Sequence, residues 1–182
     1  MLFRSECMSV VMNSGEVSRA LRRISHEIIE KNPESSSLLL LGIPTRGAYL
    51  AKRIALIISE IESREILHGT LDVTMYRDDL RMRPPRALLP TEIPSGSVDG
   101  CDVVLIDDVF YSGRTIRAAL DAVAEFGRPK TVQLAVLVDR GHRELPIRAD
   151  FVGKNLPTCR DERVFVTLSE IDSVDEVKIE VG

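Results

Sequence analysis

The sequence predicts an α/β fold in which helices flank a mostly parallel central sheet. Residues 38–41 and 103–106 are uninterrupted apolar runs without the alternation of a half-buried strand, which is typical of parallel strands buried on both faces. Each run is followed by a glycine-containing turn and then by an amphipathic helical segment. Residues 131–138, which are mostly apolar, are predicted to form a further buried strand. Because the chain has 182 residues, we expect a single domain over residues 1–182.

The composition narrows the class of protein. A formal net charge of −4 argues against general binding of polyanions, so any contact with nucleic acid requires a local basic patch. The cysteines Cys7, Cys101 and Cys159 are far apart and include no CxxC pair, which favours a reducing compartment over a disulfide framework or a zinc site. No signal peptide core and no stretch of ~18 apolar residues is present, so we expect a cytoplasmic protein. The natural start remains open among Met1, Met8 and Met12.

A helix is predicted over residues 14–31. Asn13 and Glu16 can form a capping pair at its start, and Asn32 followed by Pro33 ends it. At 100° per residue, an aliphatic stripe faces the core and a basic stripe lies on the opposite side. The aliphatic stripe contains Val17, Leu21, Ile24 and Ile28, and the basic stripe contains Arg19, Arg22, Arg23 and His26. For a single helix, an ordinary solvated face is the simpler interpretation of the basic stripe, and a binding face remains open.

The strongest functional signal follows the second apolar run. Asp107 and Asp108 stand at the strand end where open α/β sheets bind ligands, and would accept hydrogen bonds from sugar hydroxyls or hold a metal through water. The turn of Ser112 and Gly113 leads into a helix over residues 115–126, which builds a cradle of backbone N–H groups suited to a phosphate. A helix cap needs one acid next to the helix, whereas two acids precede this helix by several residues, so a ligand site is favoured over a cap. The inward face of this helix is predicted to contain Ile116, Ala119, Leu120 and Val123.

A second strand-to-helix turn follows the first apolar run, at residues 42–47. It contains two glycines and Arg46, whose planar guanidinium suits the oxygens of a diphosphate. It matches neither GxGxxG nor a Walker motif, which argues against dinucleotide binding and nucleotide hydrolysis. The helix after this turn is predicted to bury Leu50, Ile54, Ile57, Ile58 and Ile61.

The remaining segments predict a lid and a small hood. Residues 71–76 alternate as a strand with one buried face, and residues 77–99 contain four prolines and little periodicity. Such a segment is either a lid over the site or an exposed hairpin tip. Residues 139–157 are polar and rich in turn residues, and we expect them to form a hood together with the terminal segments. Short strands are expected over residues 164–168 and 177–181, one of them near the sheet edge.

Residues 103–115 resemble the ribose-phosphate signature of the type I phosphoribosyltransferases in the order of strand, acid pair, turn and threonine. The resemblance implies that fold, with the acids on the ribose hydroxyls, the turn on the 5′-phosphate and residues 42–47 as the pyrophosphate loop. It also implies Mg²⁺, held at Asp107 and Asp108 through water and substrate. The predicted catalytic residues are Asp107, Asp108, Arg46 and Arg140. The predicted substrate-binding residues are Thr45, Arg46, Gly47, Arg77, Asp78, Tyr111, Ser112, Gly113, Arg114, Thr115, Phe151 and Val152.

Two features bear on the base that is transferred. Residues 150–153 resemble the base pocket of the purine enzymes of this family, which implies that Phe151 stacks on the base and that the backbone of Val152 reads its edge. Phe151 is equally typical of a core aromatic. Tyr111 stands where those purine enzymes carry an acid, so the resemblance favours a pyrimidine as the base.

Residues 19–31, 45–47, 76–80 and 138–157 resemble one branch of the family, whose members transfer phosphoribosyl groups to uracil and also regulate pyrimidine operons. This resemblance implies the reaction of uracil with phosphoribosyl diphosphate to UMP and pyrophosphate, UMP- or UTP-dependent binding of leader messenger RNA, and a homodimer or larger homo-oligomer. The implied RNA-binding residues are Arg22, His26, His142, Arg143, Arg148 and Lys154, although relatives often have a small hydroxyl residue in place of Arg22. A regulator that only senses the nucleotide and a purine-salvage transferase remain alternatives. Control by transcription attenuation or at translation is also open.

Overall fold

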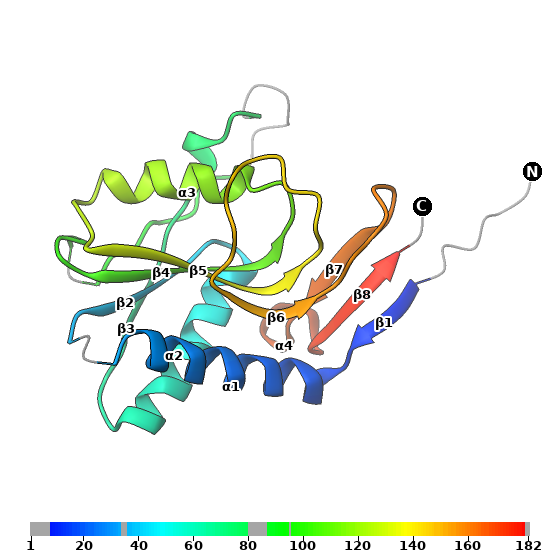
Figure 1. Ribbon diagram of the computed structural model, residues 1–182, viewed down its shortest axis with the longest axis horizontal. Coiled ribbons are helices and arrows are strands. Elements are labelled where there is room, and N and C mark those ends of the chain that lie inside the picture. Colours follow the sequence, from blue (N-terminus) through cyan, green and yellow to red (C-terminus); the bar gives the residue numbers. More distant parts are fainter. Residues whose placement is uncertain (1–7, 34–35, 80–86, 95, 181–182) are drawn as a thin grey trace, which may run out of the picture.

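The computed structural model describes residues 8–33, 36–79, 87–94 and 96–180, and it contains two sheets (Figure 1). The larger sheet is parallel throughout and has the strand order β3-β2-β4-β5-β6. Its strands are β2 (Leu38–Gly42), β3 (Leu67–Thr70), β4 (Asp102–Phe110), β5 (Thr131–Asp139) and β6 (Phe151–Asn155). The smaller sheet is antiparallel, with the order β1-β8-β7, and joins β1 (Met8–Met12), β7 (Arg163–Thr167) and β8 (Glu176–Glu180).

Helices cover both faces of the large sheet. Helices α1 (Ser14–Lys31) and α2 (Arg46–Glu62) lie on one face, and α3 (Arg114–Ala124) lies on the other (Figure 1). Successive residues of β2 enter different cores: Leu38 and Leu40 pack with α1 and α2, whereas Leu39 and Leu41 pack with α3. Burial on both faces is the physical reason that this strand shows no polar alternation. The predicted fold, a mostly parallel sheet flanked by helices, is confirmed.

The first helix begins and ends as predicted. The Glu16 amide donates to the Asn13 side chain at 3.0 Å, and the Asn13 amide donates to the Glu16 carboxylate at 2.9 Å, so the capping box is complete. The aliphatic stripe is buried and the basic stripe is exposed. Arg23 does more than face solvent, because its guanidinium donates to the backbone carbonyls of Val152 and Gly153 on β6.

Several boundaries differ from the prediction. Strand β4 continues to Phe110, so Asp107 and Asp108 are among the last residues of the strand and do not follow it. Helix α3 begins at Arg114 and ends at Ala124. Leu120 and Ile61 were predicted to face inward, but both are exposed, since each lies at the margin of its helix's apolar stripe.

The prediction of a strand at residues 71–76 is wrong. Leu71 and Val73 are buried as expected, but they belong to a loop that ends in the short 3-10 helix η1 (Thr74–Tyr76). The actual strand, β3, lies just before it and pairs with β2. Thr70 at its end also pairs with Glu92, so part of the predicted lid returns to the sheet edge.

The hood also differs in composition from the prediction. Residues 151–155 form β6, the edge strand of the large sheet, whereas β7 and β8 leave the large sheet and pair with the N-terminal strand β1. The short helix α4 (Ser169–Asp172) connects β7 to β8. Part of the predicted lid (80–86 and 95), together with Met1 and Cys7, lies outside the described residues. Among the described helices, none combines the length and apolar character needed to cross a membrane.

Candidate active site

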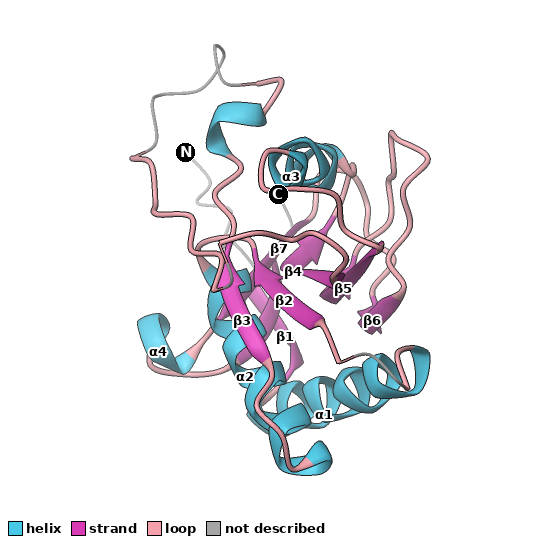
Figure 2. Ribbon diagram, turned by 90° about the vertical axis from the view of Figure 1, so that its left-hand side faces the viewer, coloured by secondary structure: helices cyan, strands magenta, loops and turns pink. Residues whose placement is uncertain are grey.

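The carboxyl ends of three neighbouring strands meet at one edge of the large sheet. Strand β4 lies between β2 and β5, all in the same direction, as Figure 2 shows. The three segments that follow these strands therefore start side by side: the loop at 42–47, the turn at 111–113 and the loop at 140–150. This placement was expected from the sequence, because loops after adjacent parallel strands share one edge of the sheet.

The turn between β4 and α3 forms a cavity of about 440 Å³. Gly113 caps α3 with a φ of 92°, a left-handed conformation that favours glycine, and Leu145 covers it at 3.5 Å from where a Cβ would lie. The amides of the turn and of the first turn of α3 are thereby offered at a helix N-terminus, which suits a phosphate. The cavity is lined by Arg77, Asp79, Asp107, Val109, Phe110, Tyr111, Ser112, Gly113, Arg114, Thr115, Ile116 and Glu144. The structure thus brings most of the predicted ribose-phosphate residues together, whereas Asp108, next to Asp107 on β4, is not among the residues that line this cavity.

The acid pair is strongly perturbed. Asp107 is only 9% exposed, and burial raises the pKa of its carboxyl well above the usual range, with the neighbouring charge of Asp108 adding to the effect. The Asp108 amide donates to Asp107 Oδ1 at 2.9 Å, and the Val109 amide donates to Asp108 Oδ1 at 2.8 Å. A buried carboxyl beside a second one, at the wall of a phosphate-type cavity, is typical of a functional site.

Burial of the Asp107 carboxyl should lower the stability of the folded protein at neutral pH. Because the folded chain binds the Asp107 proton more tightly than the unfolded chain does, stability falls as pH rises from the ordinary carboxyl range through the raised pKa. We therefore expect Asp107→Asn to raise the stability at neutral pH by about 1 kcal/mol, or about 2–4 °C in melting temperature. Thermal unfolding of both proteins between about pH 4 and about pH 8 tests this, because the gap should widen as the pH rises. A constant gap, or a less stable variant at neutral pH, would contradict a raised pKa for Asp107 in the folded chain.

The loop at 42–47 packs directly against the end of β4. A Cβ on Gly47 would lie 2.4 Å from the carbonyl oxygen of Ile106, and one on Gly42 would lie 2.3 Å from the carbonyl oxygen of Gly47. Both positions therefore exclude any side chain, and the Ile43 amide donates to the same Ile106 oxygen at 2.8 Å. The peptide bond between Pro44 and Thr45 is cis. A second cavity, of about 220 Å³, lies beside the loop and is lined by Pro44, Thr45, Ala48, Tyr49, Thr70, Leu89, Pro90 and Glu92.

The arginines around the cavity are paired with acids. Arg77 forms a two-pronged pair with Asp79, at 2.8 and 3.0 Å, and donates to the Thr115 hydroxyl at 3.2 Å. The bond to Asp79 raises the pKa of Arg77. Arg114 joins two segments, donating to Asp78 at 2.6 Å and to Glu144 at 2.9 Å. Asp79 and Glu144 were not predicted as site residues, since nothing along the sequence indicates which acid meets which arginine.

Arg46 and Arg140, both predicted to be catalytic, point to other parts of the chain. The guanidinium of Arg46 pairs with Asp172 on α4. Arg140 is 8% exposed and donates to three oxygens of residues 158–162, namely Thr158 Oγ1 at 3.1 Å, the Cys159 carbonyl at 3.2 Å and the Glu162 carbonyl at 2.7 Å. Neither residue is among those that line the cavity of about 440 Å³.

Arg140 also connects the cavity to the loop after β5. Its guanidinium carbon lies 4.2 Å from the ring centre of Tyr111, and the Tyr111 ring meets the His142 ring edge-on at 6.0 Å. His142 Nε2 in turn contacts the Thr158 carbonyl. Tyr111, predicted to bind substrate, and His142, predicted to bind RNA, are therefore parts of one packed group.

The predicted base-pocket residues lie on β6. Phe151 is 3% exposed and packs in the core layer beneath α1 and α2, with Lys31 Nζ 5.4 Å from its ring centre. Val152 is half-buried and packs with the opposite core layer. Neither residue is among those that line the cavity at the phosphate turn, so the chain as described has Phe151 as a core aromatic.

The predicted RNA-binding residues occupy α1, β6 and the loop between β5 and β6. Arg22 and His26 are exposed on α1, Arg143 and Arg148 are exposed in the loop, and Lys154 is half-buried on β6. Helix α1 packs against β6. A third cavity, of about 210 Å³, lies between these two elements and is lined by Met12, Glu16, Arg19, Ala20, Arg23, Gly153 and Lys154. The basic stripe of α1 thus continues onto β6.

Comparisons with known proteins agree with this geometry. The family model of the phosphoribosyl transferase domain matches residues 11–171. The chain is 60% identical to "Bifunctional protein PyrR" of Leifsonia xyli, over 95% of this chain and 97% of the relative. It is also 60% identical to the protein of that name from Streptomyces coelicolor, over 92% and 86%, and 57% identical to that of Mycobacterium ulcerans, over 93% and 92%.

Among solved structures, the hypoxanthine phosphoribosyltransferase of Trypanosoma cruzi in complex with IMP superposes with a TM-score of 0.73. The match covers 100% of this chain and 94% of the other at 14% identity, so it bears on the fold alone. The family model spans most of the chain, and the relatives match nearly end to end. The chain therefore belongs to the phosphoribosyl transferase family, within its group of bifunctional PyrR proteins.

Proposed function

We propose that this protein transfers the phosphoribosyl group of phosphoribosyl diphosphate to uracil, and that it also binds pyrimidine leader RNA when UMP or UTP is present. The transferase activity is supported mainly by the cavity of about 440 Å³, in which Asp107, whose pKa is raised, and the phosphate-type turn at 111–113 lie together at the carboxyl end of β4. The high identity to bifunctional PyrR proteins over nearly the whole chain supports the pairing of the two activities.

The reaction is a displacement at the anomeric carbon of the ribose. The bond from this carbon to the diphosphate oxygen breaks, pyrophosphate leaves with the bonding electrons, and uracil N1 forms the new bond and releases its proton. Amides of the turn at 111–113 and the hydroxyls of Ser112 and Thr115 hold the 5′-phosphate. Asp107 and Asp108 orient the ribose hydroxyls and stabilise the positive charge that develops on the ring.

The carboxylates of Asp107 and Asp108 suit Mg²⁺ only when the substrate supplies further oxygen ligands to the ion. Asp107 and Asp108 are adjacent carboxylates, the ligand type that this ion prefers, but no group of three or more metal-ligating side chains occurs among the described residues. The carboxylates would hold the ion through water and through the substrate's own oxygens. When bound, the ion neutralises charge on the leaving diphosphate.

The choice of uracil over a purine follows from the phosphate turn. Between Phe110 and Thr115 the turn contains no acid, and Tyr111 occupies the position at its mouth. A purine acceptor requires proton handling at N7, for which this turn supplies no carboxylate, whereas uracil has no N7 and needs no carboxylate at that place. Homo-oligomeric assembly and a cytoplasmic location remain parts of the proposal.

The alternative, a regulator that only senses nucleotides, predicts binding without turnover. The acid pair and the glycine-packed loop at 42–47 favour retained catalysis, because neither UMP nor UTP, the nucleotides that such a regulator would sense, places a diphosphate at the anomeric carbon.

A transfer assay with uracil, hypoxanthine and orotate tests the proposed activity. With phosphoribosyl diphosphate and Mg²⁺, we expect labelled uracil to become UMP and the other two bases to remain unchanged. Efficient formation of IMP would favour purine salvage, and binding of UMP without turnover of any base would favour the sensing regulator.

A further inference from the structure

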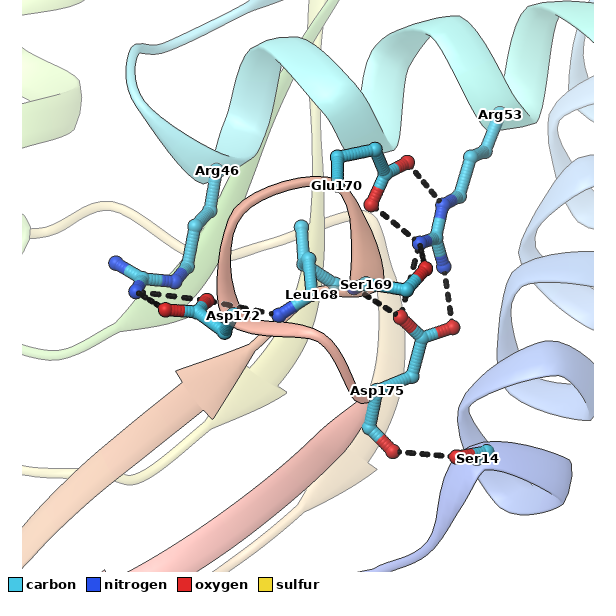
Figure 3. A network of polar contacts seen from close by, with 8 residues as sticks. All are labelled: Ser14, Arg46, Arg53, Leu168, Ser169, Glu170, Asp172 and Asp175. Carbon is cyan, nitrogen blue, oxygen red and sulfur yellow. Dashed lines mark hydrogen bonds and ion pairs between the residues drawn. The ribbon is translucent and has the colours of Figure 1, made fainter.

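Residues 169–175 connect β7 to β8 and form a corner of the smaller sheet. This corner contacts α2 through two arginines of the helix. Arg46 and Arg53 lie two turns apart on α2, and both reach residues 169–175 of this corner (Figure 3). Arg46 is the first residue of α2 and belongs to the loop at 42–47, whereas Arg53 lies farther along the helix. The two contacts use the same kinds of groups but differ in how completely they bond the guanidinium.

The contact of Arg53 is saturated. Its Nε donates to Glu170 at 2.7 Å, its Nη1 donates to Asp175 at 2.7 Å, and its Nη2 donates to both acids and to the Ser169 hydroxyl. These bonds raise the pKa of Arg53, and the Asp175 carbonyl continues the network to the hydroxyl of Ser14 on α1. Each of the three guanidinium nitrogens has a hydrogen-bond acceptor within the chain, so this contact holds the corner of the smaller sheet against the helices.

The contact of Arg46 is incomplete. Both oxygens of Asp172 accept from one nitrogen, Nη2, at 3.1 and 3.0 Å. Arg46 Nε is buried without a hydrogen-bond partner among the described residues, and Nη1 points away from Asp172 (Figure 3). Since buried donors are almost always paired, a guanidinium held at one end with its other donors unused indicates a group that is positioned for a further acceptor.

Asp172 is itself firmly placed. Its Oδ2 accepts from the Leu168 amide at 3.0 Å, and its own amide donates to the Leu168 carbonyl at 2.7 Å. The Leu168 amide keeps the pKa of Asp172 below its usual range, and Arg46 adds to this effect. The carboxylate therefore stays charged and presents a fixed anchor to Arg46.

We propose that Asp172 is a positioning residue for the diphosphate of the substrate, acting through Arg46. This inference rests on the proposed function, in which the loop at 42–47 receives the diphosphate. A free arginine side chain samples many rotamers, and anchoring one nitrogen removes this freedom before the substrate arrives. The remaining donors of Arg46 then meet the diphosphate oxygens without first being ordered.

The variant Asp172→Asn tests the proposal. We expect its KM for phosphoribosyl diphosphate, and its KM for pyrophosphate in the reverse reaction, to rise between about tenfold and about a hundredfold. The KM for uracil and the affinity for UMP should not change, because neither ligand carries a diphosphate. Steady-state kinetics in both directions measure these constants, and this split separates a positioning role from a general loss of structure.

Glu170→Gln is the matched control, since it replaces an acid of the same corner that bonds Arg53 and not Arg46. We expect it to lower the melting temperature without raising the KM for phosphoribosyl diphosphate. If Asp172→Asn fails to fold, Asp172→Glu keeps the charge and displaces the oxygens, and should raise the same KM by a smaller factor.

An unchanged KM in the folded Asp172 variant would overturn the proposal. A lower KM would also overturn it, because it would mean that Asp172 competes with the diphosphate for Arg46. Failure of the wild-type protein to convert uracil in the same assay would instead contradict the proposed function, so the two failures are distinguishable.

Discussion

Replacing Asp108 with asparagine should lower the turnover of phosphoribosyl transfer about 10²- to 10³-fold while leaving the fold intact. The substitution removes the negative charge that faces the developing positive charge of the ribose. It keeps the side-chain oxygen that accepts from the Val109 amide, so the local backbone of β4 should not change. Initial rates of UMP formation and circular dichroism spectra of the two proteins measure the two parts of this expectation.

Asp121→Asn is the matched control for this prediction. Asp121 is exposed on α3 and forms a surface ion pair with Arg117, so the same chemical change there should alter turnover little. Wild-type turnover in the Asp108 variant would contradict its assignment to the site, as would an equal loss in both variants.

Removing Arg143 should weaken the binding of pyrimidine leader RNA about fivefold to about a hundredfold and leave UMP synthesis nearly intact. Arg143 is exposed in the loop between β5 and β6 and is not among the residues that line the phosphate cavity. Affinity on a basic face comes largely from phosphate contacts, so binding should fall steeply with salt, and losing one contact should flatten this dependence. His26→Ala, on the adjoining α1, should act in the same direction.

Arg117→Ala is the control for the RNA prediction. Arg117 is also exposed but lies on α3, on the opposite side of the large sheet from α1. Filter binding in the presence of UMP, at two salt concentrations, measures all four proteins. Equal affinity of the wild type and both the Arg143 and the His26 variants would contradict a binding face made of α1 and the loop, as would an equal loss in the Arg117 control.

The parts of the fold that the sequence predicted correctly are those with a strong local signal. Strands β2 and β4 are buried on both faces and read as continuous apolar runs, and the start of α1 is specified by two residues three positions apart. Strand β3 has no such signal, because it contains an exposed leucine, a histidine and a glycine and is stabilised by its neighbours. Leu71 and Val73 are buried residues of a loop, and their spacing imitates that of a strand.

Contacts between distant segments were not predictable from the sequence. The smaller sheet pairs Met8 with Glu180, and no local pattern links such remote residues. The same holds for the acids that meet the arginines of the site. Arg140 was predicted to be catalytic, but residues 158–162 fold back and supply the acceptors of its guanidinium. In contrast, the residues of the phosphate turn are contiguous, and the sequence predicted nearly all of them.

The most direct test of the central claim follows the phosphorus atoms of the reaction. Wild-type protein is mixed with phosphoribosyl diphosphate, Mg²⁺ and uracil, and ³¹P NMR records the substrate and product signals over time. We predict that the diphosphate signals of the substrate disappear while UMP and free pyrophosphate appear in equal amounts, and that omitting uracil stops the conversion. Unchanged substrate signals in the presence of uracil would contradict the claim that this chain transfers phosphoribosyl groups to uracil.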